Sequence, residues 1–378
     1  MKKTSINLYV AILLLVALIF SLLTIYAFGE EHVGSLFVSA RSAVLYQPDN
    51  GVFLYEKNAN ERLPMASTTK IMTALVALEN SEPGDLVLID ESAIGTEGSS
   101  AYLRSGDILT MEELTYALLL QSANDAAVAI ACYISDGVEG FSALMNEKAE
   151  ALGLCDTHFT NPHGLDDAEH YTTARDLAII AAAALKNESF RGIVSTYKKT
   201  FATEERSRTY VNHNKLLHFY DGCIGVKTGF TKKSGRCLVG AAEKDGLTFI
   251  SVTLDAPSDW NDHEKMLDHG YERLERIVFS ESNDHTYKIP VLDGDKEYIT
   301  VTNPDGAFII TEKAERTEKN YLKLVRYVVA PIAEGDILGE IIYTVDGKEA
   351  ARISLVATET VNKKKEKGFL SKILSIFK

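Results

Sequence analysis

The order of apolar and polar residues along the chain predicts strands on either side of a helical region. From residue 36, two apolar runs flank Asn50-Gly51, a dipeptide that favours a β-hairpin. Through the middle of the chain, apolar residues recur at helical spacing. Three later runs, 224–229, 235–242 and 247–254, are predicted as strands, and residues 260–279 return to helical spacing.

This order of elements predicts an α+β fold for residues 30–280, in which an antiparallel sheet with a free edge strand faces a helical subdomain across a groove. A polar stretch at residues 280–284 has the composition of a linker. Residues 286–361 then form short alternating runs around an Asp346-Gly347 turn, which predicts a small all-β domain. A chain of 378 residues is long enough for both domains.

Residues 1–29 are predicted to direct export. Lys2 and Lys3 precede an almost wholly apolar run at residues 6–28, as in a signal peptide. Ala27-Phe28-Gly29 supplies small residues where a signal peptidase would cut, although the run is also long enough to span a bilayer. Cleavage and retention as an anchor both remain open, and either outcome places the rest of the chain outside the cytoplasm.

Residues 362–378 are predicted to form an amphipathic helix that binds a membrane surface. Residues 361–378 contain six lysines and one glutamate, a net side-chain charge of +5. A basic amphipathic helix suits an anionic membrane, although a solvated tail is the alternative. The apolar residues that share one face of this helix are Phe369, Leu370, Ile373, Leu374, Ile376 and Phe377.

Composition narrows the possible partners. The net charge of −14 argues against a nucleic-acid partner, which would require a basic face. The four cysteines form no Cys-x-x-Cys pair, so the usual zinc and redox motifs are missing. Cys223 and Cys237 flank one predicted hairpin and are expected to lie nearly opposite each other, either as two buried thiols or as a disulfide.

The first candidate for chemistry is Ser67-Thr68-Thr69-Lys70, which begins a run of helix formers that stops before Pro83. Helical spacing puts Ser67 and Lys70 on one face, a turn apart. A serine hydroxyl becomes a good nucleophile when a neighbouring base takes its proton. Lys70 can be that base if burial or a nearby cation lowers its pKa.

Two further motifs follow in order along the chain. Ser122-Ala123-Asn124 lies between apolar helical runs, the first of which opens with a predicted capping box at residues 110–113. Polar residues there are better placed in a cleft than in a core, where they would need buried partners. Lys227-Thr228-Gly229 supplies a second cation, and Lys70 and Lys227 are expected to lower each other's pKa and to attract a carboxylate.

The ordered set Ser-x-x-Lys, Ser-x-Asn and Lys-Thr-Gly resembles the motifs of the penicillin-recognising serine enzymes. Together with Asn161-Pro162-His163-Gly164-Leu165 and Thr172-Thr173-Ala174, it makes residues 36–361 similar to the low-molecular-mass penicillin-binding proteins that are D-alanyl-D-alanine carboxypeptidases. The resemblance implies a β-lactamase/transpeptidase-like fold and a hydrolase without a cofactor. It also implies removal of the terminal D-alanine from peptidoglycan pentapeptides and acylation by β-lactams.

The resemblance also implies roles for single residues. Ser67 would be the acylated nucleophile and Lys70 its base. Ser122 and Asn124 would relay protons and hold the substrate amide, and Lys227 would supply positive potential. Thr228, in the Lys227-Thr228-Gly229 motif, would contact the substrate carboxylate, and the N–H groups of Ser67 and Phe230 would form the oxyanion hole.

Two features of the pattern qualify these expectations. Some relatives have an arginine shortly after the strand that corresponds to residues 247–254. Residues 255–266 contain no arginine, so the group that binds the substrate carboxylate is undetermined. His158, His163 and His170 lack the spacing of a helical metal-binding pair, and no metal site is predicted.

Three other functions remain in competition. A β-lactamase on the same fold would need a glutamate that activates water, and no convincing candidate is found. A non-catalytic penicillin sensor would be expected to have lost motif residues, whereas every motif position is filled. A transpeptidase differs only in the acceptor that enters the site, which the sequence does not reveal.

Overall fold

The computed structural model describes residues 36–202 and 206–365. The helices of these ranges are η1 (Ala66–Thr69), α2 (Lys70–Glu79), η2 (Glu91–Ala93), α3 (Met111–Leu120), α4 (Asn124–Ser135), α5 (Val138–Ala151), α6 (Ala174–Leu185), α7 (Glu188–Ser195), α8 (Leu216–Phe219) and α9 (Asp259–Arg273). The strands up to α9 are β1 (Ser42–Gln47), β2 (Val52–Lys57), β3 (Leu86–Leu88), β4 (Ile108–Thr110), β5 (Lys198–Ala202), β6 (Ser207–Val211), β7 (Cys223–Thr231), β8 (Gly235–Lys244) and β9 (Leu247–Leu254).

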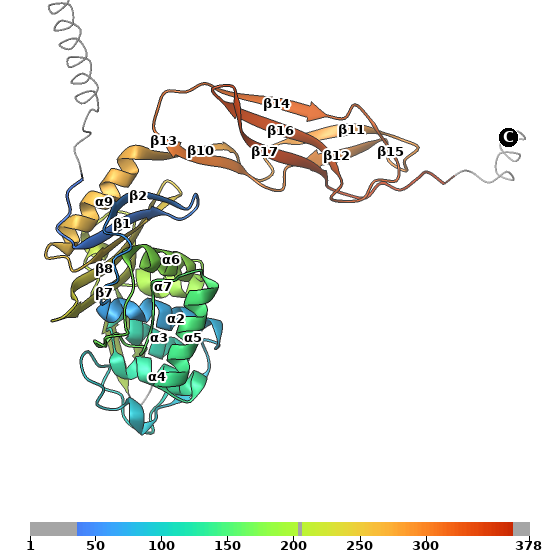
Figure 1. Ribbon diagram of the computed structural model, residues 1–378. Coiled ribbons are helices and arrows are strands. Elements are labelled where there is room, and N and C mark those ends of the chain that lie inside the picture. The colour runs from blue at the N-terminus through green and yellow to red at the C-terminus, as the bar shows by residue number, and fades with distance from the viewer. Residues whose placement is uncertain (1–35, 203–205, 366–378) are drawn as a thin grey trace, which may run out of the picture. The chain divides into compact units, whose positions relative to one another are not determined.

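The main sheet has five antiparallel strands in the order β2-β1-β9-β8-β7. The predicted hairpin forms between β1 and β2, and Gly51 takes a φ of +67° in its turn, which glycine adopts without steric cost. Strand β7 lies at one edge and pairs only with β8. The sheet together with α2 to α7 confirms the predicted α+β class (Figure 1).

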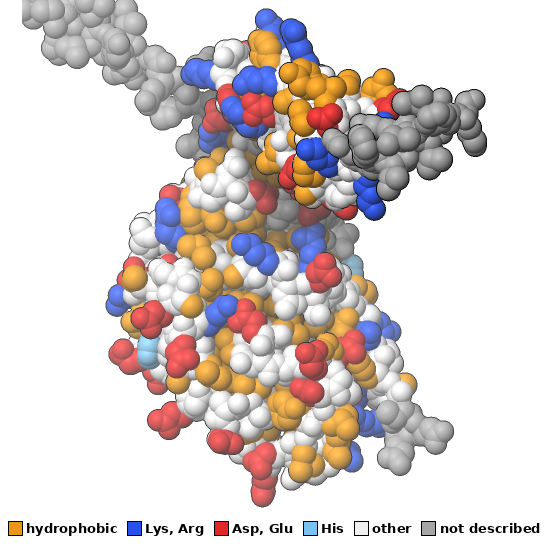
Figure 2. All heavy atoms as spheres, turned by 90° about the vertical axis from the view of Figure 1, so that its right-hand side faces the viewer, with side chains coloured by type: hydrophobic (Ala, Val, Ile, Leu, Met, Phe, Trp, Pro, Cys, Tyr) orange, Lys and Arg blue, Asp and Glu red, His pale blue; other side chains and the backbone are white. Residues whose placement is uncertain are grey.

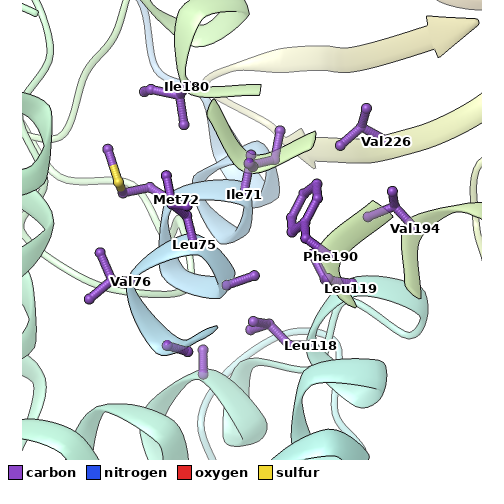
Figure 3. Packing of buried hydrophobic residues seen from close by; sticks show 14 of the residues in the cluster. Ile71, Met72, Leu75, Val76, Leu118, Leu119, Ile180, Phe190, Val194 and Val226 are labelled. Carbon is purple, nitrogen blue, oxygen red and sulfur yellow. The ribbon is translucent and has the colours of Figure 1, made fainter. Parts of the chain in front are cut away.

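Helix α2 is at the centre of the helical part. All eight residues from Lys70 to Ala77 are buried, and all of them except Lys70 and Thr73 are apolar, so α2 is enclosed on every face. Figure 3 shows Ile71 and Leu75 of α2 among side chains from the neighbouring helices and from β7. The neighbours labelled there are Leu118 and Leu119 of α3, Ile180 of α6, Phe190 and Val194 of α7, and Val226 of β7. This packing holds the start of α2 rigidly against the sheet.

Two local predictions require correction. Thr110 accepts a hydrogen bond from the N–H of Glu113, as a capping box requires, but the Glu113 carboxylate instead binds Arg206 and Tyr210. The helix predicted for residues 260–279 ends at Arg273, and the rest forms β10. The sequence there contains Ile277, Val278 and Phe279, which favour a strand, and β10 pairs with a later strand.

The predicted cysteine arrangement is also wrong in register. Cys223 lies opposite Ala242 and Cys237 opposite Gly229, so the two cysteines are separated by six residues along the hairpin rather than facing each other. Six residues correspond to about 20 Å of strand, too far for a disulfide. Both are free thiols, as the first alternative expected, although Cys223 is only partly buried.

The later strands form a second β structure. They are β10 (Leu274–Ser280), β11 (Thr286–Leu292), β12 (Tyr298–Thr302), β13 (Ala307–Glu312), β14 (Glu318–Leu324), β15 (Val328–Val329), β16 (Ile337–Val345) and β17 (Lys348–Ala357). Strand β10 pairs with β13, and six strands form a sheet in the order β14-β16-β17-β12-β11-β15. The Asp346-Gly347 hairpin forms as predicted, and residues such as Ile299 and Leu355 make a core of their own.

The predictions for residues 1–29 and most of the predicted C-terminal helix, from residue 366 onward, lie outside the described residues. Within the described ranges no single helix is long and apolar enough to cross a membrane, and one pair, α4 and α5, passes that test only as two segments bent by 83°. On the face shown in Figure 2, acidic side chains are scattered among basic and apolar ones.

Candidate active site

The predicted nucleophile and base lie at the start of α2. Ser67 lies in the 3-10 turn η1, and Lys70 is the first residue of the α-helix that continues from it. The Nζ atom of Lys70 is 3.0 Å from Oγ of Ser67. Lys70 is fully buried, whereas Ser67 is partly exposed and lines a cavity. The serine hydroxyl can therefore meet a substrate while its partner stays away from water.

Lys70 has two more hydrogen-bond partners. Its Nζ lies 2.7 Å from Oδ1 of Asn124, the first residue of α4, and 2.5 Å from the backbone oxygen of His163. The Asn124 amide nitrogen binds the backbone oxygen of Glu97, which fixes the orientation of the amide. Both Asn124 Oδ1 and His163 O can only accept hydrogen bonds.

This partner set directs the lone pair of a neutral Lys70. A neutral amine has two N–H groups and one lone pair, and the oxygens of Asn124 and His163 take both N–H groups. The remaining partner, the Ser67 hydroxyl, can donate as well as accept. A neutral Lys70 therefore presents its lone pair to the proton of Ser67, which is the geometry of a general base.

Electrostatics favour the neutral form of Lys70. Burial lowers its pKa well below the ordinary lysine value, and the charge of Lys227 lowers it further, while Asp125 opposes the shift. Burial also lowers the pKa of Lys227 to about 7. The expectation that each lysine depresses the other therefore holds for Lys70, whereas the shift of Lys227 is caused by burial.

Ser122 occupies the turn between α3 and α4 with a φ of +60°, an uncommon conformation for a residue other than glycine. It is buried and lines the same cavity as Ser67. Among the described residues, its hydroxyl has no hydrogen-bond partner. Ser122 is thus available to a bound substrate.

Strand β7 forms the opposite wall. Lys227 is fully buried and its Nζ donates to the Thr228 backbone oxygen at 2.9 Å, while Thr228 lines the cavity. A β-carbon on Gly229 would lie 2.9 Å from the backbone nitrogen of Ser67, so only glycine lets the strand approach this closely. Phe230 follows and is largely exposed. The edge position of β7 leaves backbone groups free to bind an extended peptide.

The sequence predicted a turn at Asn161-Pro162-His163-Gly164 but assigned it no role in the site. Oδ1 of Asn161 accepts the N–H of Gly164 at 2.7 Å, and the Pro162 backbone oxygen accepts the hydroxyl of Thr73 at 2.6 Å. These bonds tie the turn to α2 and aim the His163 backbone oxygen at Lys70. The signal in the sequence was Asn161 itself, because an asparagine in a turn commonly bonds its side chain to the backbone that follows.

His170 supports the Ser67 turn from behind. Its Nδ1 accepts the backbone N–H of Thr160 at 3.1 Å, so the proton of the neutral ring is on Nε2, 2.8 Å from Oγ1 of Thr69. The Thr69 hydroxyl in turn donates to the Ala66 backbone oxygen at 2.7 Å. Burial lowers the pKa of His170 to about 4, which keeps this chain of hydrogen bonds intact at neutral pH.

Asp125 is a second residue whose role the sequence did not reveal. Its buried carboxylate accepts hydrogen bonds from Ser100 Oγ at 2.6 Å, Ala101 N at 2.9 Å and Leu103 N at 3.1 Å. These bonds hold the loop that also contacts Asn124 and contributes Ser99 to the cavity. Asp125 therefore shapes one wall of the site.

The site is a cavity of about 430 Å³, a size suited to a small ligand or the end of a peptide. It brings together Ser67, Ser122, Thr228, Gly229 and Phe230, with Lys70 and Lys227 buried beside them. The lining also includes residues to which the sequence had assigned no part in the site, namely Ser99, His213, Lys215, Arg236, Cys237, Asp259 and Trp260.

The comparisons with known proteins agree with this geometry. Residues 30–258 match the family model described as D-alanyl-D-alanine carboxypeptidase, and residues 276–363 match that of the penicillin-binding protein 5 C-terminal domain. The chain is 36% identical to the D-alanyl-D-alanine carboxypeptidase DacF of Bacillus subtilis over 344 residues, which cover 88% of this chain and 87% of the relative.

Two solved structures are similar as well. Penicillin-binding protein 5 of Haemophilus influenzae has a TM-score of 0.63 and 30% identity, with 88% of this chain and all of that chain covered. The Streptomyces K15 DD-transpeptidase has a TM-score of 0.59 and 36% identity, with 62% of this chain and 98% of that chain covered. The first family model spans more than half of the chain, and the Bacillus relative spans most of it. The chain therefore belongs to the D-alanyl-D-alanine carboxypeptidase family.

Proposed function

We propose that the chain is a serine-type D-alanyl-D-alanine carboxypeptidase in which Ser67 is the nucleophile. Oγ of Ser67 attacks the carbonyl of the terminal peptide bond while its proton passes to Nζ of Lys70. The intermediate collapses, the C–N bond breaks, and D-alanine leaves with a proton on its amine. Water then attacks the Ser67 ester, which releases the shortened peptide and restores the hydroxyl.

The observation that carries this proposal is the hydrogen bonding of Lys70. Two carbonyl oxygens, from Asn124 and His163, take the N–H groups of the neutral amine and leave its lone pair for Ser67. The same three oxygens would also satisfy the three N–H groups of a charged lysine, so the geometry supports a base in combination with the lowered pKa of Lys70. The low pKa that burial gives Lys70 fits the same role.

The other motif residues are proposed to bind and polarise the substrate. Ser122 lies free in the cavity and can pass a proton to the leaving amine. Asn124 is not among the residues that line the cavity, and its side chain holds Lys70 and Glu97; its second amide N–H is proposed to hold the substrate amide. The N–H groups of Ser67 and Phe230 are proposed as the oxyanion hole, because Gly229 brings β7 against the Ser67 turn. Lys227 adds positive potential and Thr228 a hydroxyl for the substrate carboxylate.

Two partners follow from this mechanism. The substrate is the pentapeptide of peptidoglycan, and β-lactams acylate the same serine because their strained amide takes the place of the terminal peptide bond. Hydrolysis of β-lactams as the main reaction is not favoured, since the relatives named above are carboxypeptidases and a transpeptidase. A non-catalytic sensor is not favoured either, because the site has all its motif residues in place.

The substrate is outside the cytoplasm, so we infer an exported protein on the cell-wall side of the cytoplasmic membrane. The apolar residues 6–28 after two lysines support export, and the basic amphipathic sequence of residues 362–378 supports surface binding. Flotation with anionic vesicles tests the second inference. Binding should be lost when residues 362–378 are deleted, and unchanged binding would contradict the inference.

Release of D-alanine from a pentapeptide, measured beside labelling with fluorescent penicillin, tests the mechanism. Ser67→Ala should abolish both while thermal unfolding stays cooperative. Mass spectrometry of the labelled wild-type protein should locate the adduct on Ser67. Persistent labelling of the variant would remove Ser67 from the mechanism.

A further inference from the structure

A carboxypeptidase must recognise a free terminal carboxylate. Residues 255–266, where some relatives have an arginine, contain none, and the start of α9 carries the acidic residues Asp259 and Asp262. Asp262 of α9 is buried and accepts hydrogen bonds from Ser39 N at 2.8 Å, Ser39 Oγ at 2.6 Å and Ala40 N at 3.1 Å. It therefore anchors the chain before β1. Asp259, the first residue of α9, is buried as well and faces the cavity.

Asp259 pairs with an arginine that comes from another element. Nη2 of Arg236, on β8, lies 3.0 Å from Oδ2 of Asp259. The Asp259 side chain is 5% exposed and the Arg236 side chain 46% exposed, so the acid is a fixed anchor and the guanidinium is accessible. In the sheet, Arg236 lies directly opposite Phe230 of β7, and both line the cavity with Ser67.

Among the described residues, Arg236 is the only arginine that lines this cavity, and Asp259 is its only ion-pair partner there. A guanidinium has five N–H groups on two edges, so it can hold one carboxylate on one edge and receive a second on the other. Asp259 thus orients Arg236 and leaves donors for an incoming anion.

Other cations near the site are less suited to this task. Lys227 is fully buried, and its Nζ is already bonded to the Thr228 backbone oxygen. Lys215 and His213 line the cavity, but neither has the planar pair of donors that matches a carboxylate. Arginine also stays charged at every pH at which the enzyme would work.

We propose that Arg236, oriented by Asp259, binds the terminal carboxylate of the peptide substrate and determines the specificity for a free C-terminus. This inference rests on the proposed function. The carboxylate-binding group, which the sequence left undetermined, is then Arg236 of β8. The ion pair between Arg236 and Asp259 orients this group as well as joining β8 to α9.

The test compares two substrates that differ only at the C-terminus, a peptide ending in D-Ala-D-Ala and the same peptide as its C-terminal amide. Arg236→Ala should lower kcat/KM for the free acid by about 10- to 100-fold, the range for a lost charged hydrogen bond, mainly through KM. The amide should change little, so the preference for the acid should collapse. Arg236→Lys should keep part of the preference for the free acid, because lysine retains the positive charge.

Arg191→Ala is the matched control, because Arg191 is partly exposed like Arg236 and forms an ion pair with Glu243 of β8 outside the cavity. It should leave the ratio of the two kcat/KM values unchanged. Asp259→Asn should reduce the ratio less than Arg236→Ala does, through loss of orientation.

Equal losses on both substrates would overturn the inference, because a purely structural role lowers them together. If Arg236→Ala does not fold, Arg236→Gln provides the same comparison, and an unchanged ratio in that variant would also overturn it. Failure of the wild-type protein to release D-alanine would instead contradict the proposed function.

Discussion

A β-carbon placed on Gly164 would lie 2.0 Å from the backbone oxygen of Ala66. The turn that holds the His163 backbone oxygen against Lys70 is thus in direct backbone contact with the turn that holds Ser67. Gly164 also has a φ of +88°. Lys70 and Ser67 are therefore positioned by two turns whose backbones are in direct contact, which leaves no room for a side chain at residue 164.

Gly164→Ala should therefore reduce acylation by fluorescent penicillin about 100-fold, because a shift of about 1 Å at a catalytic group has effects of this size. Gly153→Ala is a matched control. Gly153 has a similar φ of +76°, but a β-carbon there meets nothing within 4 Å. Both variants should lose about 1–2 kcal/mol of stability from backbone strain, and Gly164→Ala should lose more because its β-carbon also overlaps the backbone of Ala66. Similar acylation rates in the two variants would contradict the packing argument.

The Lys70→Arg variant distinguishes a role of Lys70 as general base from a role as positive charge. Arginine keeps the positive charge but does not give up its proton near neutral pH. If Lys70 is the general base, acylation should fall by about 10²- to 10⁴-fold. Stopped-flow labelling with fluorescent penicillin measures the rate, and Lys70→Met shows the effect of removing charge and base together. An active Lys70→Arg protein would assign Lys70 an electrostatic role only.

The pH dependence of kcat/KM should be bell-shaped. Activity rises with pH as Lys70, whose pKa is strongly lowered by burial, loses its proton and becomes a base. It falls again as Lys227, with a pKa of about 7, loses the charge that attracts the substrate carboxylate. Initial rates across the pH range check both limbs. Lys227→Ala should be slower and should lack the falling limb near neutral pH, and a limb that persists in this variant would belong to another group.

Stability should decline in acid because burial lowers the pKa of His170, as it does those of His163 and His263. The pKa of His170 is about 4 in the folded protein and about 6.5 when unfolded, so below pH 6.5 the unfolded state binds a proton that the folded state does not. The free energy of unfolding should fall by about 1.4 kcal/mol per pH unit from pH 6.5 to about 4 on this account. Urea unfolding at several pH values measures the slope, and His170→Gln should make it shallower. An equal slope in both proteins would exclude His170 as a cause.

The sequence by itself determined the elements and most of the chemistry. The start of the helix at Ser67-Thr68-Thr69-Lys70, the two hairpins and the strand of Lys227 were all readable, because periodicity and turn residues report local conformation. Residues 274–279 were misread as helix, since their strand conformation depends on pairing with β13, more than 25 residues later.

Only the tertiary structure decided how the site is assembled. Two of the three partners of Lys70 are 54 and 93 residues away, and the ion pair between Arg236 and Asp259 joins a strand to the helix after the next strand. The register of the β7 and β8 hairpin separates Cys223 from Cys237 and places Arg236 opposite Phe230. Such contacts depend on the packing of whole elements against one another, and a pattern that records only which face of each element is apolar does not contain that information.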